Sequence, residues 1–285
     1  MIDDEKFRKA HEGRSTRGEG VTLVGFYGLN NSGWLRDSQD KLKRELTHRL
    51  SDYPGLVRAR ANGWVHATVS GLEGLKDKDG KIVTDNMRSR ARNTGEAVRP
   101  FLVEEFLQFI RGAATMRLRF GECAPQDVNP HDQHRRPWER SFEVREDGLA
   151  VLMGWPLGKD WSRFASDLHD LRTAFQKFGV VHKYHLKQDD IDNDLFMVIA
   201  ALEYPIWTRL SEQERRCVGV ILEQFQEEAR ELLEREPFDA DLSPDQIWVV
   251  KYRRATLDDV VFAKRVTEMT ADEMRRLYDR SESGS

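Results

Sequence analysis

The strongest constraint on the fold is an internal repeat with a spacing of 130 residues. When the sequence is shifted by 130 positions, His66 falls on Phe196. In this register the segment 66–73, HATVSGLE, lies over 196–203, FMVIAALE, with two identical and three conservatively exchanged positions. Self-similarity at a fixed spacing indicates that one supersecondary unit occurs twice in the chain.

The expected secondary structure repeats as well. In the same shift Val21 falls on Val151, and both residues lie in runs of apolar residues typical of a buried strand. In each half such a run is followed by apolar residues at helical spacing and then by a second strand. Along the chain we expect strands at 21–29, 64–72, 116–124, 148–158, 194–203 and 246–257 and helices at 35–50, 101–112, 161–179 and 211–236. Residues 257–279 should form one or two final helices, and residues 74–100 a loop or a short excursion.

We therefore predict an α+β fold made of two pseudo-symmetric lobes. Each lobe would have a small mixed or antiparallel sheet with helices on its outer face, and the two sheets would enclose a central cleft. The expected division is a flexible N-terminus over 1–18, a first lobe over 19–123, a connecting segment over 124–147, a second lobe over 148–256, and a C-terminal helix and tail over 257–285.

Charge and composition narrow the classes of function. The 45 basic and 49 acidic residues give a net charge of −4 with both signs interspersed, so we expect no binding to duplex DNA or to an anionic membrane. No signal peptide and no run of about 18 apolar residues occurs, which predicts a soluble, cytoplasmic protein. Cys123 and Cys217 form no metal motif, and the acidic run 189–194 lacks the glycine and bidentate glutamate of an EF-hand. We predict no metal and no cofactor, and the oligomeric state stays open.

His66, Thr68 and Ser70 place an imidazole and two hydroxyls at alternate positions of one expected strand. Alternate residues of a strand point to the same face, so these side chains would lie side by side. An imidazole can transfer protons near neutral pH, and hydroxyls can bind phosphoryl oxygens. The alternative is a structural histidine that is buried and hydrogen-bonded away from any cleft.

A duplicated unit whose central strand carries His66-Ala67-Thr68 resembles the two-histidine (2H) phosphoesterase superfamily, which includes bacterial RNA ligase/cyclic phosphodiesterase-like proteins. In topology the resemblance covers about residues 21–256. It implies that each lobe supplies one His-x-Ser/Thr motif and that the two histidines, one as base and one as acid, flank a 2′,3′-cyclic phosphate or a 2′-5′ linkage. It also implies that His66 is an acid/base group and that Thr68 binds the phosphate.

The second half departs from the family pattern. The repeat puts Phe196 at the position of the second histidine and Val198 at that of the second Ser/Thr. His182 and His185 precede this strand but do not match the family spacing. Two functions stay open: a phosphodiesterase that uses His66 as its remaining acid/base group, and a catalytically inactive module that binds a nucleotide or a protein.

Further candidate side chains surround the expected cleft. Ser70 would bind substrate on the motif strand, and Tyr27 and Trp155, near the ends of equivalent strands, would stack a base. Arg88 and Arg90 would hold a phosphate through their guanidinium groups. The alternatives are core packing for the two aromatic residues and a solvated surface for the two arginines.

Overall fold

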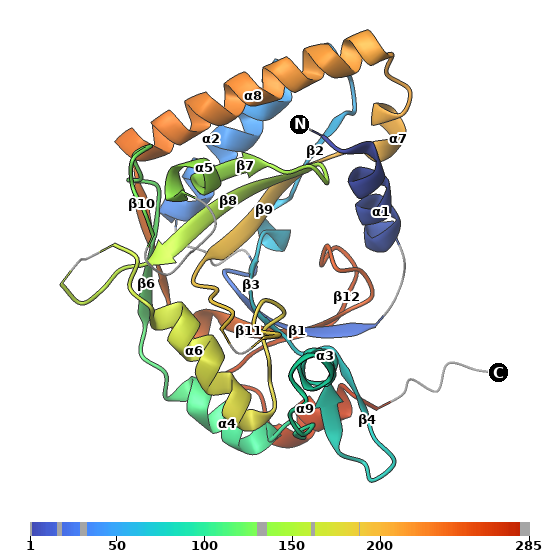
Figure 1. Ribbon diagram of the computed structural model, residues 1–285, viewed down its shortest axis with the longest axis vertical. Coiled ribbons are helices and arrows are strands. Elements are labelled where there is room, and N and C mark those ends of the chain that lie inside the picture. Colours follow the sequence, from blue (N-terminus) through green and yellow to red (C-terminus); the bar gives the residue numbers. More distant parts are fainter. Residues whose placement is uncertain are drawn as a thin grey trace.

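One large antiparallel sheet organises the protein, which has an α+β fold (Figure 1). The computed structural model describes residues 2–15, 19–28, 33–129, 136–160, 163–187 and 189–279. The strands of these residues are β1 (Gly20–Gly25), β2 (Val57–Ala59), β3 (Ala67–Gly71), β4 (Gly74–Lys76), β5 (Ile82–Thr84), β6 (Met116–Phe120), β7 (Phe142–Val144), β8 (Leu149–Pro156), β9 (Leu195–Leu202), β10 (Phe238–Leu242), β11 (Ile247–Tyr252) and β12 (Val260–Arg265). The main sheet has the order β10-β6-β8-β9-β3-β1-β11-β12, with β2 paired to β9 and β7 to β8, and β4 and β5 form a separate hairpin.

Among the helices, α8 is the one whose start is marked most clearly in the sequence. Helix α8 begins at the predicted capping box, in which Ser211 and Glu214 each accept the backbone N–H of the other. None of the helices in the described ranges is long and apolar enough to cross a membrane. They are α1 (Asp4–Ser15), α2 (Gly33–Arg49), α3 (Asp85–Thr94), α4 (Val103–Arg111), α5 (Pro137–Ser141), α6 (Asp167–Phe175), α7 (Tyr204–Trp207), α8 (Glu212–Arg235) and α9 (Ala271–Arg276), with 3-10 turns η1 (Asn62–Trp64), η2 (Gln176–Phe178) and η3 (Pro244–Gln246).

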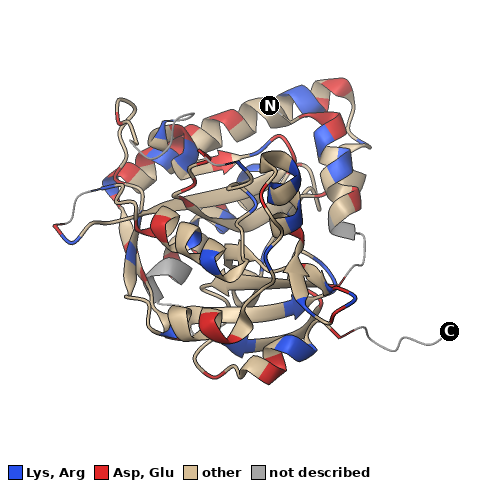
Figure 2. Cartoon of the chain, turned by 60° about the horizontal axis from the view of Figure 1, so that its bottom comes forward, with Lys and Arg blue, Asp and Glu red and all other residues tan. Residues whose placement is uncertain are grey.

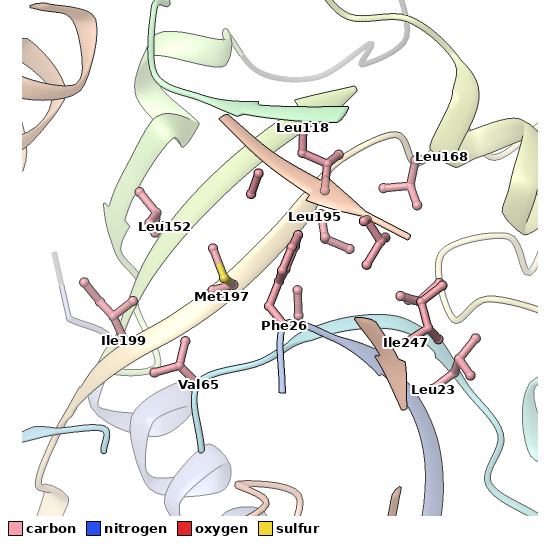
Figure 3. Close-up of a cluster of buried hydrophobic side chains, with 14 of the residues drawn as sticks. Leu23, Phe26, Val65, Leu118, Leu152, Leu168, Leu195, Met197, Ile199 and Ile247 are labelled. Atoms are coloured by element: carbon pink, nitrogen blue, oxygen red, sulfur yellow. The ribbon is translucent and has the colours of Figure 1, made fainter. Parts of the chain in front are cut away.

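One face of the sheet packs against the apolar stripes of α2, α4, α6 and α8 and forms the main hydrophobic core. Figure 3 shows Leu23 of β1, Leu152 of β8 and Met197 of β9 in this core. Their strand neighbours Val24 and Val151 belong to two smaller clusters instead. Because side chains alternate along a strand, these smaller clusters lie on the opposite face of the sheet.

The two halves of the sheet exchange strands. Strand β11 pairs with β1, and β6 pairs with β8 and β10. Each half of the sheet is therefore built from both of the segments, 19–123 and 148–256, that the sequence suggested as lobes. The halves meet where β3 runs antiparallel to β9, through the single pair Ala67 and Met197. The described sheet is one continuous structure.

A β-bulge marks the same point in both motif strands. The pairing of β3 with β1 skips Val69, and the pairing of β9 with β8 skips Ile199. The backbone N–H groups of Leu72 and Leu202 also match, because each donates to a carbonyl at the start of the neighbouring strand, at 2.9 and 2.8 Å. Both matched pairs are 130 residues apart, so the predicted spacing is confirmed for the motif strands.

The first strands of the two halves are equivalent at a different spacing. Val24 pairs with Thr68, and Val151 pairs with Val198. Val24, rather than Val21, is therefore the counterpart of Val151, and the predicted match is wrong by three residues. The reason is that the connection between the first strand and the motif strand is three residues longer in the second half, a change that surface connections tolerate well.

Three segments fold differently from the sequence-based prediction. The expected loop over 74–100 contains the β4–β5 hairpin and α3, and the expected helix over 257–279 begins with the strand β12. Part of the N-terminus predicted to be flexible forms α1, whose Phe7 is fully buried and packs against Tyr204 at 5.2 Å between ring centroids. The β4–β5 hairpin and the pairing of β12 with β11 are local, whereas α1 packs against a partner almost 200 residues away in the sequence. Residues 280–285 of the predicted tail lie outside the described residues.

Candidate functional site

The motif strands bring two pairs of side chains to the sheet face opposite the main core. Ala67 and Met197 pair with each other and both belong to the main core. Because side chains alternate, their neighbours project from the other face, where the antiparallel register puts Thr68 beside Phe196. We call this surface the central face; it is defined by His66, Thr68, Phe196 and Val198.

Ser70 does not belong to the central face. The bulge at Val69 moves it to the other side of the strand, where it pairs with Leu23 of the main core. Ser70 is fully buried, and its hydroxyl lies 3.4 Å from the Gly71 carbonyl oxygen, to which it donates. The prediction that Ser70 lies beside Thr68 and binds substrate is therefore wrong, because one inserted residue reverses the alternation.

Arg172 of α6 holds the bulge of β3 in place. Its guanidinium donates to the carbonyl oxygens of Thr68 (3.2 Å) and Val69 (3.0 Å). It also donates to the carboxylate of Asp192 (2.8 Å) and to the carbonyl oxygen of Asp194 (2.9 Å). The side chain is almost completely buried. Arg172 thus fixes the motif strand to the segment that leads into β9.

His66 is anchored at one ring nitrogen. Nδ1 lies 2.8 Å from the carbonyl oxygen of Trp64, which can only accept, so Nδ1 carries the proton and Nε2 has a lone pair. Burial, with a smaller contribution from the charge of Arg60, lowers the pKa of His66 to about 3. The imidazole is therefore neutral at physiological pH. A group with this pKa is a weak base, because proton transfer is most efficient when the pKa lies near the working pH.

A carboxyl–phenol pair lies on the same side of the sheet as the central face. Tyr252, which belongs to the apolar cluster around Val24, donates its hydroxyl to Oε1 of Glu73 at 2.7 Å. Burial is the main cause that raises the pKa of Glu73. Gly71 makes room for this pair, because a Cβ at that position would lie 2.4 Å from Oε2 of Glu73.

A tight turn after α6 reaches the central face from the second half. His185 donates its backbone N–H to the carbonyl oxygen of His182 at 2.9 Å, which closes the turn. Its two middle residues, Lys183 and Tyr184, are exposed, whereas both histidines are buried. The ammonium of Lys183 lies 5.3 Å from the ring centroid of Phe196 and 4.6 Å from that of Tyr184.

The two arginines predicted to bind phosphate have structural partners. Arg90 is buried, is paired with the carboxylate of Glu96, and donates to the carbonyl oxygen of His185 at 2.8 Å. The prediction for Arg90 is therefore wrong, because its guanidinium is already fully engaged in holding the turn. Arg88 is partly buried and lies 3.4 Å from the carbonyl oxygen of Leu75 in the β4–β5 hairpin. Neither residue reaches the central face through a recorded contact.

The two predicted stacking residues differ in their accessibility. Trp155 is buried and packs edge-on against Phe164, with ring centroids 5.8 Å apart, so it cannot stack a base. Tyr27 is partly exposed and packs edge-on against Trp248 at 5.9 Å. This aromatic pair belongs to the cluster around Val24, on the same side of the sheet as the central face. Tyr27 stays a candidate and Trp155 does not.

A pocket of about 1050 Å³ adjoins the central face on the side of the second half. Phe196 and Met153 lie in its wall together with the exposed Tyr184, and His66 does not contribute to it. Eight acidic and five basic side chains line the pocket, so its charge disfavours a phosphate group. Figure 2 shows basic and acidic residues interspersed along the chain as well. Within the described ranges, no cluster of three or more His, Cys, Asp or Glu could hold a metal ion.

Several residues of this region escaped sequence-based prediction. The signal for Arg172 is its place at helical spacing between the buried Leu168 and Phe175, because a charged residue within an apolar stripe needs a buried partner. For Glu73 the sequence offers one signal, its identity with Glu203 in the repeat. Lys183 lies between two histidines that were weighed as acid/base groups, and nothing in the local pattern indicates that it points toward Phe196.

Comparisons with known proteins supply no function. No protein-family model matches the sequence, and no curated protein matches it. A crystal structure of a conserved protein of unknown function, ATU0111 from Agrobacterium tumefaciens str. C58, is similar over 85% of this chain and 84% of that chain. The sequence identity is 13% and the TM-score is 0.38, a value too low to carry an argument.

Proposed function

We propose that the protein binds a nucleotide or an RNA-end phosphodiester of the 2′,3′-cyclic or 2′-5′ type on the central face and does not hydrolyse it. The observation that carries this proposal is the composition of the central face. His66 and Thr68 of one half lie beside Phe196 and Val198, the residues at the equivalent positions of the other half. One half offers polar groups and the other offers an apolar surface.

The polar groups of the central face are available to a ligand. Within the described residues, no recorded hydrogen bond engages Oγ1 of Thr68 or Nε2 of His66. The hydroxyl can donate to a phosphoryl oxygen, and the neutral imidazole can accept a hydrogen bond from a sugar hydroxyl. Phe196 is partly exposed and offers a ring on which a base can stack. Arg172 holds β3 through the carbonyl oxygens of Thr68 and Val69, so the hydroxyl of Thr68 is positioned before the ligand arrives.

The same face argues against efficient hydrolysis. Opening a cyclic phosphodiester uses a base on one side and an acid on the other, and each group typically contributes about 10²- to 10⁴-fold. Phe196 and Val198 cannot transfer a proton. The low pKa of His66, about 3, also leaves it a poor proton acceptor at neutral pH. Slow or absent turnover is what these two properties together predict.

Calorimetric titration with 2′,3′-cyclic nucleotides and 2′-5′ dinucleotides tests the proposal, with chromatography of the same mixtures to detect products. We expect saturable binding and no product. Thr68→Val should reduce the affinity about 10-fold or more, the loss typical of one hydrogen bond to a charged group, and His66→Ala about 2- to 10-fold, the loss typical of one hydrogen bond between neutral groups. His48→Ala is the matched control, because His48 is an exposed residue near the end of α2. Absence of binding by the wild-type protein would contradict the proposal.

One observation favours a second function, a phosphodiesterase with His66 as its remaining acid/base group. The contact from Nδ1 to the Trp64 carbonyl orients the ring and leaves Nε2 free to accept a proton. Product formation that disappears in His66→Ala but persists in His48→Ala would establish this function in place of binding alone.

A further inference from the structure

The turn from His182 to His185 carries one cationic side chain, Lys183, in a fixed position. Its two ends are buried and its two middle residues are exposed, so Lys183 and Tyr184 project from a rigid support. A four-residue turn closed by its own backbone hydrogen bond has little freedom to reorient. The direction in which Lys183 leaves the backbone is therefore set by the two anchors.

His182 is held by its burial and His185 by tertiary hydrogen bonds. Nδ1 of His182 lies 3.0 Å from Oδ2 of Asp192, the carboxylate that accepts from Arg172, but it makes no hydrogen bond within the described residues. Nε2 of His185 lies within hydrogen-bond distance of Nδ1 of His169, at 3.2 Å. Arg90 adds a hydrogen bond to the carbonyl oxygen of His185. The turn and the motif strand β3 are thus held by one connected set of buried groups.

The ammonium of Lys183 lies over the ring of Phe196, the residue that takes the place of the second histidine in the repeat. Its positive charge also acts on Glu73, in the first half of the sheet, where it opposes the rise in the pKa of that carboxyl. Because Phe196 lies beside Thr68 in the register of β3 and β9, the ammonium over its ring lies on the central face. Within the described residues no carboxylate forms an ion pair with Lys183.

We propose that Lys183 is the phosphate-binding cation of the central face and supplies, from the turn, the positive charge that a second imidazole would otherwise bring. This inference rests on the proposed function and adds to it the source of the charge. The ligand accordingly carries its phosphate between Thr68 and Lys183, with its base or sugar on the side of Phe196. An ammonium attracts a phosphate as a point charge, so no particular orientation of its stem is required.

The test compares a ligand with and without phosphate in two lysine variants. 2′,3′-cyclic AMP and adenosine are titrated into the wild-type protein, Lys183→Met and Lys187→Met. Lys187 is the matched control because it is exposed in the same segment and loses the same charge. We expect Lys183→Met to weaken binding of 2′,3′-cyclic AMP about 10- to 100-fold and to leave the affinity for adenosine unchanged. Lys183→Arg should keep most of the wild-type affinity for 2′,3′-cyclic AMP.

The outcomes separate the two proposals. Unchanged binding in Lys183→Met, with binding still weakened by Thr68→Val, would overturn the role of Lys183 and leave the proposed function standing. Equal losses in Lys183→Met and Lys187→Met would also overturn it, because the effect would then be one of overall charge. A wild-type protein that binds neither compound would overturn both proposals. Because Lys183 is exposed, thermal unfolding should show that both lysine variants are folded.

Discussion

Replacing Arg172 by methionine tests the account of the motif strand. Methionine keeps much of the stem but removes the guanidinium, which makes five hydrogen bonds to Thr68, Val69, Asp192 and Asp194. The change leaves the carboxylate of Asp192 buried without its cation. Removing one partner of a buried ion pair costs about 3–5 kcal/mol, and we expect the free energy of unfolding to fall by that amount. Since whole domains have only about 5–15 kcal/mol, the loss is large.

Urea denaturation followed by tryptophan fluorescence measures this difference. Arg216→Met is the matched control, because Arg216 is exposed on α8 and forms an ion pair with Glu212 at the surface. Its replacement should change the free energy of unfolding by less than about 0.5 kcal/mol. The double variant Arg172→Met/Asp192→Asn should recover part of the loss, because it removes the charge that the single variant leaves uncompensated.

A loss below about 1 kcal/mol in Arg172→Met, or no recovery in the double variant, would contradict the assigned role of Arg172. Either result would mean that the buried guanidinium does not hold β3. The preorganisation of Thr68, on which ligand binding is argued to depend, would then need another source.

Three further predictions concern acid, thiols and packing. Burial lowers the pKa of His185 to about 3, so the unfolded state binds more protons than the folded state between pH 6.5 and 3. The free energy of unfolding therefore falls as the pH is lowered through that window, by up to about 1.4 kcal/mol per pH unit. In urea denaturation, the free energy of unfolding of His185→Gln should depend less steeply on pH. A thiol reagent at pH 8 should label Cys217 and spare Cys123, whose burial raises its pKa to about 12, and mass spectrometry after unfolding in urea should show both labelled. Gly71→Ala should lower the free energy of unfolding in urea by about 0.5–1.5 kcal/mol, because its Cβ would push the carboxylate of Glu73 away from the hydroxyl of Tyr252 and weaken their hydrogen bond.

Controls for these predictions come from exposed positions. His48→Gln should leave the pH dependence of stability as it is in the wild-type protein, because His48 is exposed. Gly219→Ala should raise stability by up to about 1 kcal/mol, since Gly219 lies inside α8 with open space where its Cβ would be. Equal pH dependence in His185→Gln and His48→Gln, labelling of Cys123 in the folded protein, or a neutral Gly71→Ala would each contradict the corresponding prediction.

The sequence predicts those parts of the fold that depend on local patterns of residues. The match of 66–73 with 196–203 located both motif strands because their inward-facing residues and their bulges repeat together. The capping box at Ser211 located the start of α8 because the cap is made within four residues. Neither result required knowledge of a distant contact.

The parts that sequence missed depend on distant partners. Ser70 was placed on the wrong face because a bulge cannot be read from alternation alone. Arg90 resembled a free cation because its acceptors near His185 lie about 95 residues further along the chain. Lys183 was overlooked because its position over Phe196 depends on a turn that two buried histidines anchor. The role of a charged side chain depends on its tertiary partners, whereas apolar periodicity indicates a buried face whatever those partners are.

The exchange of strands between the halves has a consequence for synthesis of the chain. Gly20 of β1 pairs with Tyr252 of β11, so β1 finds this neighbour only after the chain as far as residue 252 has emerged from the ribosome. Until then one edge of β1 stays open, and an unpaired strand edge is a template for aggregation. A nascent chain truncated before β11 cannot complete the first half of the sheet. The first half of the sheet is therefore completed only after β11 has been synthesised.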